Sequence, residues 1–291
     1  LETYGREAQK KAFIPGQFTG ETRVCFGLTE AAHGSDATHM GTRAVPETRG
    51  GKAGWRIDGE KMWITGMHHA THCAVFARTS GKDGSATGIS CFLVPVPSDG
   101  LVIEEYMWTF NMPTDHPRLS LNNVWVPEDA LFGELDHGLA LAQCFVHENR
   151  IRQAASSLGA AVFCIEESIK YARVRSPFGK PLSSNQAIQF PLVELATQAE
   201  MLRLLIRKTA WEMDRMTQAE VEHRLSDKVS MCNFWANRLC CEAADRAMQV
   251  HGGMGYSRHK AFEHIYRHHR RYRITEGSEE IQKRKVAGFL F

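Results

Sequence analysis

The sequence predicts an α+β protein with more than one domain, in which an antiparallel β domain is followed by an antiparallel helical bundle. Two observations support this prediction. Before about residue 130, the chain consists of short apolar runs separated by turn residues, which is typical of strands. After Pro127, apolar residues recur every three or four positions, which is typical of long amphipathic helices. A chain of 291 residues has room for roughly two such domains.

Five apolar runs in the first part are expected to form strands. Glycine-containing pairs such as Gly50-Gly51 and Asp58-Gly59 lie between the runs and mark turns. The segment KMWITG, residues 61–66, also has strand character, because a Trp beside a β-branched residue and a Thr suits a pleated surface. The five runs are residues 24–28, 73–77, 89–96, 101–103 and 119–126.

The second part is expected to contain three long helices and one short one. Three helices with a continuous apolar stripe favour an antiparallel bundle, and the shorter helix should fill residues 257 to about 273. At the front of the chain, residues 7–13 are expected to be the end of a helix that Pro15 and Gly16 break. The three apolar stripes run through residues 154–172, 188–206 and 225–250.

Composition excludes several functional classes. Hydrophobic residues make up 43% and charged residues 23%, as in ordinary globular proteins. The 35 basic and 33 acidic side chains leave a net charge of +2, which indicates no nucleic-acid partner. No apolar run is long enough for a transmembrane helix, and no signal peptide is visible. The eight cysteines show no CxxC or zinc-ligand spacing, so we interpret them as reduced core residues of an intracellular protein.

Two stretches of the β part could together hold a flat ligand. Residues 26–36, FGLTEAAHGSD, follow a strand with small residues, and the backbone N–H groups freed there can meet an anionic or carbonyl-rich ligand. An ordinary turn, with its own polar side chains on its backbone, explains the same stretch. In KMWITG, one planar aromatic and one hydroxyl donor are what a flat heteroaromatic ring would need.

Three further stretches interrupt the helical part. In RVRSPFGKPLSSNQ, residues 173–186, an Arg closes one helix and a Gln opens the next. In QVHGGMGY, residues 249–256, a helix cap explains one glycine, and three glycines suggest close approach of a phosphate or another chain. In YRITEGSEEIQ, residues 272–282, Glu276 precedes a glycine where a helix should stop.

Taken in this order, the five stretches resemble the signposts of the acyl-CoA dehydrogenase family of flavoproteins. The resemblance runs from about residue 20 to the end of the chain. It implies a barrel-like middle β domain at residues 23–128, a C-terminal up-down four-helix bundle at 129–291, and a remnant of an N-terminal helical domain at 1–22. It also implies bound FAD, an acyl-CoA substrate, electron-transfer flavoprotein or another acceptor, and a homodimer or homotetramer.

The resemblance identifies Glu276 as the expected catalytic base. In the family, the base removes the proton α to the thioester, and the β hydrogen passes as hydride to flavin N5. Burial under substrate would raise the carboxylate pKa toward the working pH. Some members carry the base on the first long helix just before an Arg, which here is Asn149 before Arg150. Glu148 is one residue, or about 100°, away from that position.

The resemblance also implies binding residues and no metal. Glu279 and Glu280 compete with Glu276 only by residue type, because they follow the break. Substrate contacts are expected from Ser35, Arg150 and Gly277. FAD contacts are expected from Phe26, Leu28, Thr29, Gly34 and Ser35 at the ring and pyrophosphate, Trp63 and Thr65 at the ring and N5, Arg175, Phe178, Gln186, Gln249, Gly252 and Gly253 toward a neighbouring subunit's FAD, and Ser278 and Glu280 near the adenosine half.

The sequence departs from the family pattern at several positions. Residues 31–33 replace the usual PGA-like turn, Phe26 stands where Tyr is common, and Thr275 stands where an aromatic is common, which would widen the pocket. His268 replaces an Asp, so residues 264–273 are unusually basic and form either a solvated face or a contact to CoA or FAD phosphates.

The largest departure is the short front, which starts at Leu1 and fits a truncated, processed or naturally shortened chain. Two alternatives to a dehydrogenase therefore stay open. One is a non-catalytic or partner-dependent subunit, which the short front favours. The other is a flavin oxidase or monooxygenase on the same fold. A cytoplasmic or mitochondrial-matrix location is expected in each case.

Overall fold

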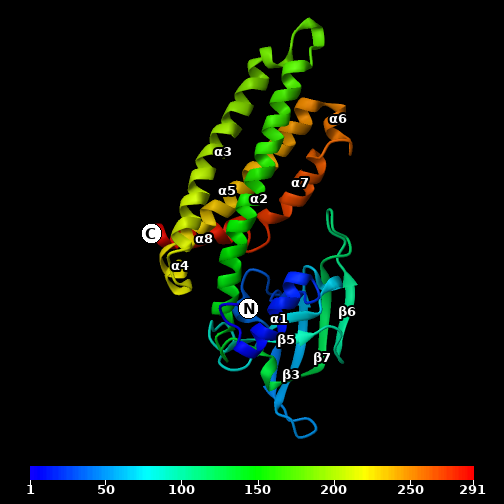
Figure 1. The fold of residues 1–291 in the computed structure, drawn as a ribbon, viewed down its shortest axis with the longest axis vertical. Helices are drawn as coiled ribbons and strands as arrows, with labels where there is room; N and C mark the ends of the chain where they lie inside the picture. Colours follow the sequence, from blue (N-terminus) through cyan, green and yellow to red (C-terminus); the bar gives the residue numbers. More distant parts are fainter. The chain divides into compact units, whose positions relative to one another are not determined.

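The computed structural model describes residues 1–291 and divides into two compact units, Leu1–Gln143 and Cys144–Phe291. The first unit carries the sheet and the second carries most of the helices, as Figure 1 shows along the sequence colours. The expected α+β fold class, β part first and helical part second, is therefore confirmed. The boundary between the units falls within helix α2, Gly138–Val174.

The first unit is built on one eight-stranded sheet. Its strand order is β6-β7-β3-β2-β4-β5-β8, and β1 pairs with β4. All five expected strands are present, whereas β2, β3 and β8 were not among the five apolar runs. The strands are β1 Val24–Gly27, β2 Arg43–Pro46, β3 Gly54–Met62, β4 His72–Arg78, β5 Ile89–Pro95, β6 Leu101–Tyr106, β7 Pro117–Pro127 and β8 Leu131–Phe132.

The sheet is not purely antiparallel, which corrects the expectation. Strands β1 and β4 run parallel, with Val24 opposite His72, and β2 makes a short parallel pairing with β4. Parallel pairs need a long connection between the two strands, and more than forty residues separate β1 from β4. The order of apolar runs along a chain does not show which distant strands pair.

Helix α1, Glu7–Thr19, corrects a second expectation, because it continues through Pro15 and ends at Gly20 with φ 80°. A proline inside a helix removes one hydrogen bond, and tertiary contacts can offset that loss. Such contacts are present: the buried side chain of Gln9 donates to the carbonyls of Asp129 and Leu131 at 3.0 and 2.9 Å.

The second unit is a helical bundle around α5, Ser226–His251. Helices α2, α3 and α5 lie side by side in Figure 1 and share one apolar core with the shorter α7. The fourth expected helix is α7 followed by a 3-10 turn, Arg271–Arg273, and α8 after that break was not expected. The remaining helices are α3 Gln186–Met213, α4 Gln218–Arg224, α6 Gly253–Tyr256, α7 Phe262–Arg270 and α8 Glu279–Leu290.

The cores confirm that the cysteines are mainly core residues. All eight are free, and seven of them are buried, the exception being the half-buried Cys144. In the first unit, β4 and β5 are buried on both faces, with apolar clusters on either side of the sheet. None of the helices combines the length and the apolar character that crossing a membrane requires.

Candidate active site

The break before α8 places Glu276 in an uncommon backbone conformation. Glu276 has φ 57° and Gly277 has φ 84°, so two consecutive residues are left-handed. Glycine adopts this region readily, whereas for glutamate it is unfavourable and persists only where the surroundings impose it. Helix α8 then begins at its N-cap Ser278, whose hydroxyl accepts a hydrogen bond from the N–H of Ile281.

Buried side chains bind the backbone of this turn from three helices. Arg150 on α2 donates from Nε and Nη2 to the carbonyl oxygen of Glu276 at 2.9 and 2.7 Å. Gln282 on α8 donates to the carbonyl of Gly277 at 2.7 Å. Asn237 on α5 donates to the carbonyl of Tyr272 at 2.9 Å. The turn is therefore fixed by side chains, which explains how it sustains the strained conformation.

A buried polar network supports these side chains. Asn233 on α5 accepts from Gln282 and from Asn237, each at 3.0 Å, and donates to the carbonyl of Arg150 at 2.9 Å. Ser157 on α2 donates to Asn237 at 2.6 Å. Buried polar groups in a connected network favour one arrangement of the surrounding chain, because breaking any bond leaves an unpaired group.

The carboxylate of Glu276 is half-buried and makes a specific contact. The side-chain amide of Asn149 donates to its Oε1, and Arg152 donates to the amide oxygen of Asn149. Burial raises the pKa of Glu276, while the Asn149 hydrogen bond and the charges of Arg150 and Arg152 act in the opposite direction. A carboxylate with a raised pKa, held on a rigid turn, is suited to accept a proton.

The other nearby acids do not share these properties. Glu279 is buried and forms ion pairs with Arg238, Arg273 and Lys283, which hold its pKa down to about 2 despite the opposing effect of burial. Glu280 and Glu148 are exposed. Glu279 is thus a structural anion, a role that its position in the sequence did not reveal.

In the first unit, a buried ion pair joins the two expected flavin-binding stretches. Lys61 Nζ lies 2.8 Å from Glu30 Oε1 and donates to the carbonyl of Leu28 at 3.1 Å. Glu30 also accepts from the N–H groups of Gly41 and Thr42 at 2.6 and 3.0 Å. Both charged side chains are at most 4% exposed. Sequence reasoning missed this pair, although both residues belong to the quoted motifs.

The segment after β3 presents the expected aromatic and hydroxyl groups. Strand β3 ends at Met62, and Trp63 has φ 63° and a side chain that is 47% exposed. The strand character expected for residues 61–66 therefore ends at Met62, and Trp63 lies in the turn that follows. The hydroxyl of Thr65 lies 3.0 Å from Nδ1 of His116.

Of the remaining expected residues of the first unit, Thr29 contacts the end of β3 directly. Phe26 and Leu28 are half-buried, and Phe26 packs on Phe76 with ring centroids 4.9 Å apart. The carbonyl of Thr29 accepts from the N–H of Met62 at 2.8 Å, which links the two stretches. Gly34 and Ser35 are exposed on the loop that follows. A cavity of about 460 Å³ beside Thr65 is lined by Arg23, Val24, Cys25, Gly66, His69 and Ala70.

The expected inter-subunit residues lie on exposed parts of the second unit. Arg175 and Gln186 are exposed, and Phe178 is fully exposed with φ 56°. Gln249, Gly252 and Gly253 are exposed at the end of α5. The structure brings none of these six residues into hydrogen-bonding contact with Glu276.

The three glycines of residues 249–256 have different roles. Gly252 has φ 60° and ψ −138°, a region that only glycine adopts readily. A Cβ on Gly255 would lie 2.4 Å from the carbonyl oxygen of Met248, so Gly255 is required for packing. A Cβ on Gly253 would meet no atom of the chain within 4 Å. Nothing within the described fold therefore explains Gly253.

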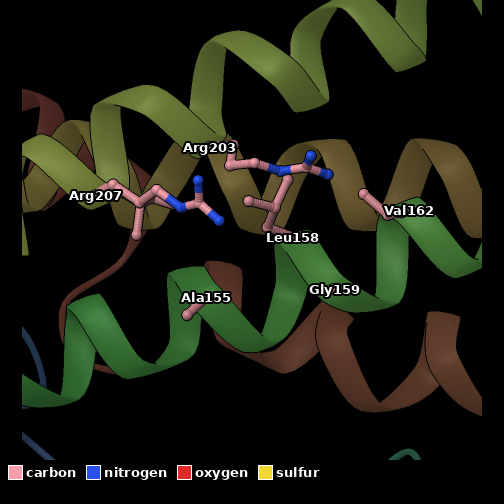
Figure 2. Close-up of a pocket in the computed structure, with 7 residues that line it drawn as sticks. Ala155, Leu158, Gly159, Val162, Arg203 and Arg207 are labelled. Atoms are coloured by element: carbon pink, nitrogen blue, oxygen red, sulfur yellow. The ribbon is translucent and has the colours of Figure 1, made fainter.

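A second cavity, of about 310 Å³, lies between α2 and α3. Figure 2 shows the side chains of Leu158 and Val162 on α2 facing Arg203 and Arg207 on α3. Gly159 and Ala155 complete the α2 side. None of the expected site residues lines this cavity, and it contains no carboxylate, so it is separate from the candidate site at Glu276.

Comparison with known proteins agrees with the geometry of both units. The profile of the acyl-CoA dehydrogenase C-terminal domain matches residues 136–291, and that of the middle domain matches residues 25–124. The chain belongs to the acyl-CoA dehydrogenase family. This confirms the resemblance to the family that the five sequence stretches indicated.

Three proteins illustrate the range of this family. The caffeyl-CoA reductase-Etf complex subunit CarC of Acetobacterium woodii is 32% identical over 289 residues, covering 98% of this chain and 73% of that protein. The mitochondrial short-chain specific acyl-CoA dehydrogenase of Bos taurus is 33% identical, covering 99% and 67%. The crystal structure of the prolyl acyl carrier protein oxidase AnaB superposes with a TM-score of 0.91 at 26% identity, covering 100% and 74%.

Proposed function

We propose that this acyl-CoA dehydrogenase family member is an FAD-dependent oxidoreductase that removes the α and β hydrogens of an acyl-CoA thioester, with Glu276 as the catalytic base. The observation that carries the proposal is the environment of Glu276. Its carboxylate is half-buried, its pKa is raised by burial, and its backbone is fixed in a strained turn by Arg150 and by the polar network beneath.

The chain offers groups that fit FAD. Trp63 exposes an indole, Thr65 carries a hydroxyl on the adjacent turn, and a Cβ on Gly34 would meet no atom within 4 Å. When bound, FAD supplies the hydride acceptor of the reaction. The remaining proposed contacts are Phe26, Leu28, Thr29 and Ser35 in the first unit, and Ser278 and Glu280 near the adenosine half.

Arg150 acts on the substrate indirectly in this proposal. Its Nε and Nη2 are bound to the carbonyl of Glu276, and its Nη1 donates to Ser230 at 3.2 Å. The side chain is 6% exposed, and each of its three guanidinium nitrogens already donates a hydrogen bond within the protein. We therefore place Arg150 as a positioning residue for the turn, and keep Ser35 and Gly277 as the proposed substrate contacts.

A homo-oligomer with FAD shared between subunits is part of the proposal. Helix α3 exposes a series of large apolar side chains that a monomer would leave in water. Gly253 and Gln249 are exposed at the end of α5, where Gly253 leaves room for close approach by another group. The exposed apolar residues of α3 are Phe190, Val193, Met201, Leu204 and Trp211.

The direction and acceptor of the reaction are also proposals. Because a relative is named a reductase–Etf complex subunit, electron-transfer flavoprotein is the proposed electron partner. An oxidase is the second candidate, because the structure that superposes over the whole chain with a TM-score of 0.91 is that of an oxidase, AnaB. We propose an intracellular location, supported by the eight free cysteines.

One spectroscopic experiment tests the proposal. The purified protein is reconstituted with FAD, its visible spectrum is recorded, and acyl-CoAs of graded chain length are added without oxygen. Bleaching of the flavin by one length class supports a dehydrogenase, and rapid reoxidation by dissolved oxygen then favours the oxidase. A protein that binds FAD but is reduced by none of the acyl-CoAs favours the partner-dependent or non-catalytic alternative. Failure to bind FAD contradicts the proposal.

A further inference from the structure

Asn149 lies between Arg152 and Glu276 and contacts both. Arg152 donates to the amide oxygen of Asn149 from Nε at 3.0 Å and also from Nη2. The amide nitrogen of Asn149 donates to Oε1 of Glu276. Asn149 is 7% exposed, so water has little access to replace either contact.

The chemistry of Arg152 fixes which way the Asn149 amide points. A guanidinium group carries only donors, so the group of Asn149 that faces it must be the acceptor oxygen. The amide nitrogen must then face Glu276, as a donor. If the amide were flipped, its N–H groups would face the N–H groups of Arg152, and its oxygen would face the carboxylate of Glu276. Neither contact could be a hydrogen bond. Arg152 thus determines that Oε1 of Glu276 accepts a hydrogen bond from the Asn149 amide.

We propose that Asn149, oriented by Arg152, is a positioning residue that occupies Oε1 of Glu276 and leaves Oε2 as the atom that takes the substrate proton. This inference rests on the proposed function of Glu276 as the base. In the transfer, the substrate C–H bond breaks, the proton forms a bond to Oε2, and the electron pair stays on the substrate. A proton on Oε1 would face the N–H of Asn149, which disfavours that alternative.

The charged groups near Glu276 give the direction in which its pKa should change when the Asn149 amide is removed. Arg150 and Arg152 approach from α2, and Glu279 on α8 is neutralised by Arg238 of α5, Arg273 and Lys283. Burial is the main effect that raises the pKa of Glu276, and the Asn149 hydrogen bond is the largest that lowers it. Removal of the Asn149 amide therefore raises the pKa of Glu276 further.

The test is a titration of Glu276 that does not depend on turnover. The FAD-loaded protein is labelled with carbon-13 at the glutamate carboxyls, and the Glu276 signal is assigned by its loss in Glu276→Gln. In Asn149→Leu the pKa of Glu276 should rise by about one unit, as expected for loss of one charge-assisted hydrogen bond. In the nearly isosteric Asn149→Asp it should rise more, because a second carboxylate oxygen then faces Oε1.

Two comparisons separate this role from a general packing effect. Glu148→Gln, on the same helix and exposed, should leave the pKa of Glu276 within a few tenths of a unit. Arg152→Met should change the pKa of Glu276 more in the wild-type background than in Asn149→Leu, because part of the influence of Arg152 depends on the Asn149 amide that it orients.

The outcomes distinguish the inference from the proposed function. If Asn149→Leu and Asn149→Asp both titrate as wild type, the positioning role is contradicted even where Glu276→Gln abolishes flavin reduction. If both shifts appear but no acyl-CoA reduces the wild-type flavin, the positioning role stands and the proposed function fails. A lowered pKa of Glu276 in Asn149→Asp would also overturn the inference. Because Asp has nearly the size of Asn, this variant provides the test if Asn149→Leu does not fold.

Discussion

Arg150 binds the backbone carbonyl of Glu276, not its carboxylate. Two guanidinium nitrogens lie 2.9 and 2.7 Å from the carbonyl oxygen, and the same arginine is 6% exposed. The carboxylate is therefore oriented through its main chain while its charge stays only partly compensated. A direct Arg–carboxylate pair would instead hold the pKa of Glu276 low and weaken it as a base.

Replacement of Arg150 by Met should disrupt the turn. The carbonyl of Glu276 would lose both donors, and a buried acceptor left unpaired costs about 1–3 kcal/mol. We expect urea denaturation to show a loss of about that size and stopped-flow flavin reduction to slow by about tenfold or more. Ser230→Ala is the matched control, because it removes only the partner of Arg150 Nη1. Equal effects of the two variants would contradict this role of the carbonyl contact.

Glu276→Gln should retain the fold and the FAD spectrum, because the two side chains are nearly isosteric. Loss of a positioned general base slows proton transfer by typically 10²- to 10⁴-fold. The measurement is anaerobic stopped-flow reduction by the best acyl-CoA, with Glu148→Gln as the control that should reduce normally. If Glu148→Gln is slow and Glu276→Gln is normal, the assignment of the base is wrong.

Lys61→Met should destabilise the first unit, because it leaves the Glu30 carboxylate buried without its cation. Breaking one partner of a buried pair costs about 3 kcal/mol or more, and FAD affinity should fall as the two stretches separate. The double variant Glu30→Gln/Lys61→Met removes both charges and should recover part of the stability. Thermal unfolding and FAD titration measure both effects. A double variant less stable than Lys61→Met would contradict the expected coupling.

Glu279 should make the stability of the protein depend on acidic pH. Its folded-state pKa of about 2 lies below the value of an unfolded chain, so its ion pairs stabilise the fold above that unfolded value. Their contribution is lost as pH falls from the unfolded value through about 2. The difference in urea midpoint between wild type and Glu279→Gln should therefore shrink over this range. A difference that is constant with pH would exclude the linkage.

Comparing Gly253→Ala with Gly255→Ala should show which glycine is needed for packing within the chain and which leaves room for a ligand or another subunit. A Cβ on Gly255 would lie 2.4 Å from Met248, whereas one on Gly253 meets nothing within 4 Å. We expect Gly255→Ala to lose about 1–3 kcal/mol of stability. Gly253→Ala should keep its stability but weaken FAD binding and association, measured by FAD titration and sedimentation. Unchanged FAD binding and association in Gly253→Ala would argue against a shared site.

Periodicity and local motifs were sufficient for much of the fold. The apolar stripes of α2, α3 and α5 follow from local amphipathicity, and five of the strands follow from apolar runs bounded by turn residues. Both signals depend only on neighbouring residues. The break before α8 was also predictable, because Gly277 follows Glu276. The passage of α1 through Pro15 was not, since the contacts of Gln9 to residues 129 and 131 come from a distant part of the chain.

The sequence by itself determined the family, the β-then-α order and the candidate base. Only the tertiary structure showed what surrounds that base: Asn149 and Glu276 are 127 positions apart, and Lys61 pairs with a glutamate 31 positions away. Such contacts depend on how elements pack, and no local pattern encodes them. The structure also distinguished Glu276 from Glu279, because burial without a paired cation raises a carboxylate pKa, whereas burial among three cations lowers it.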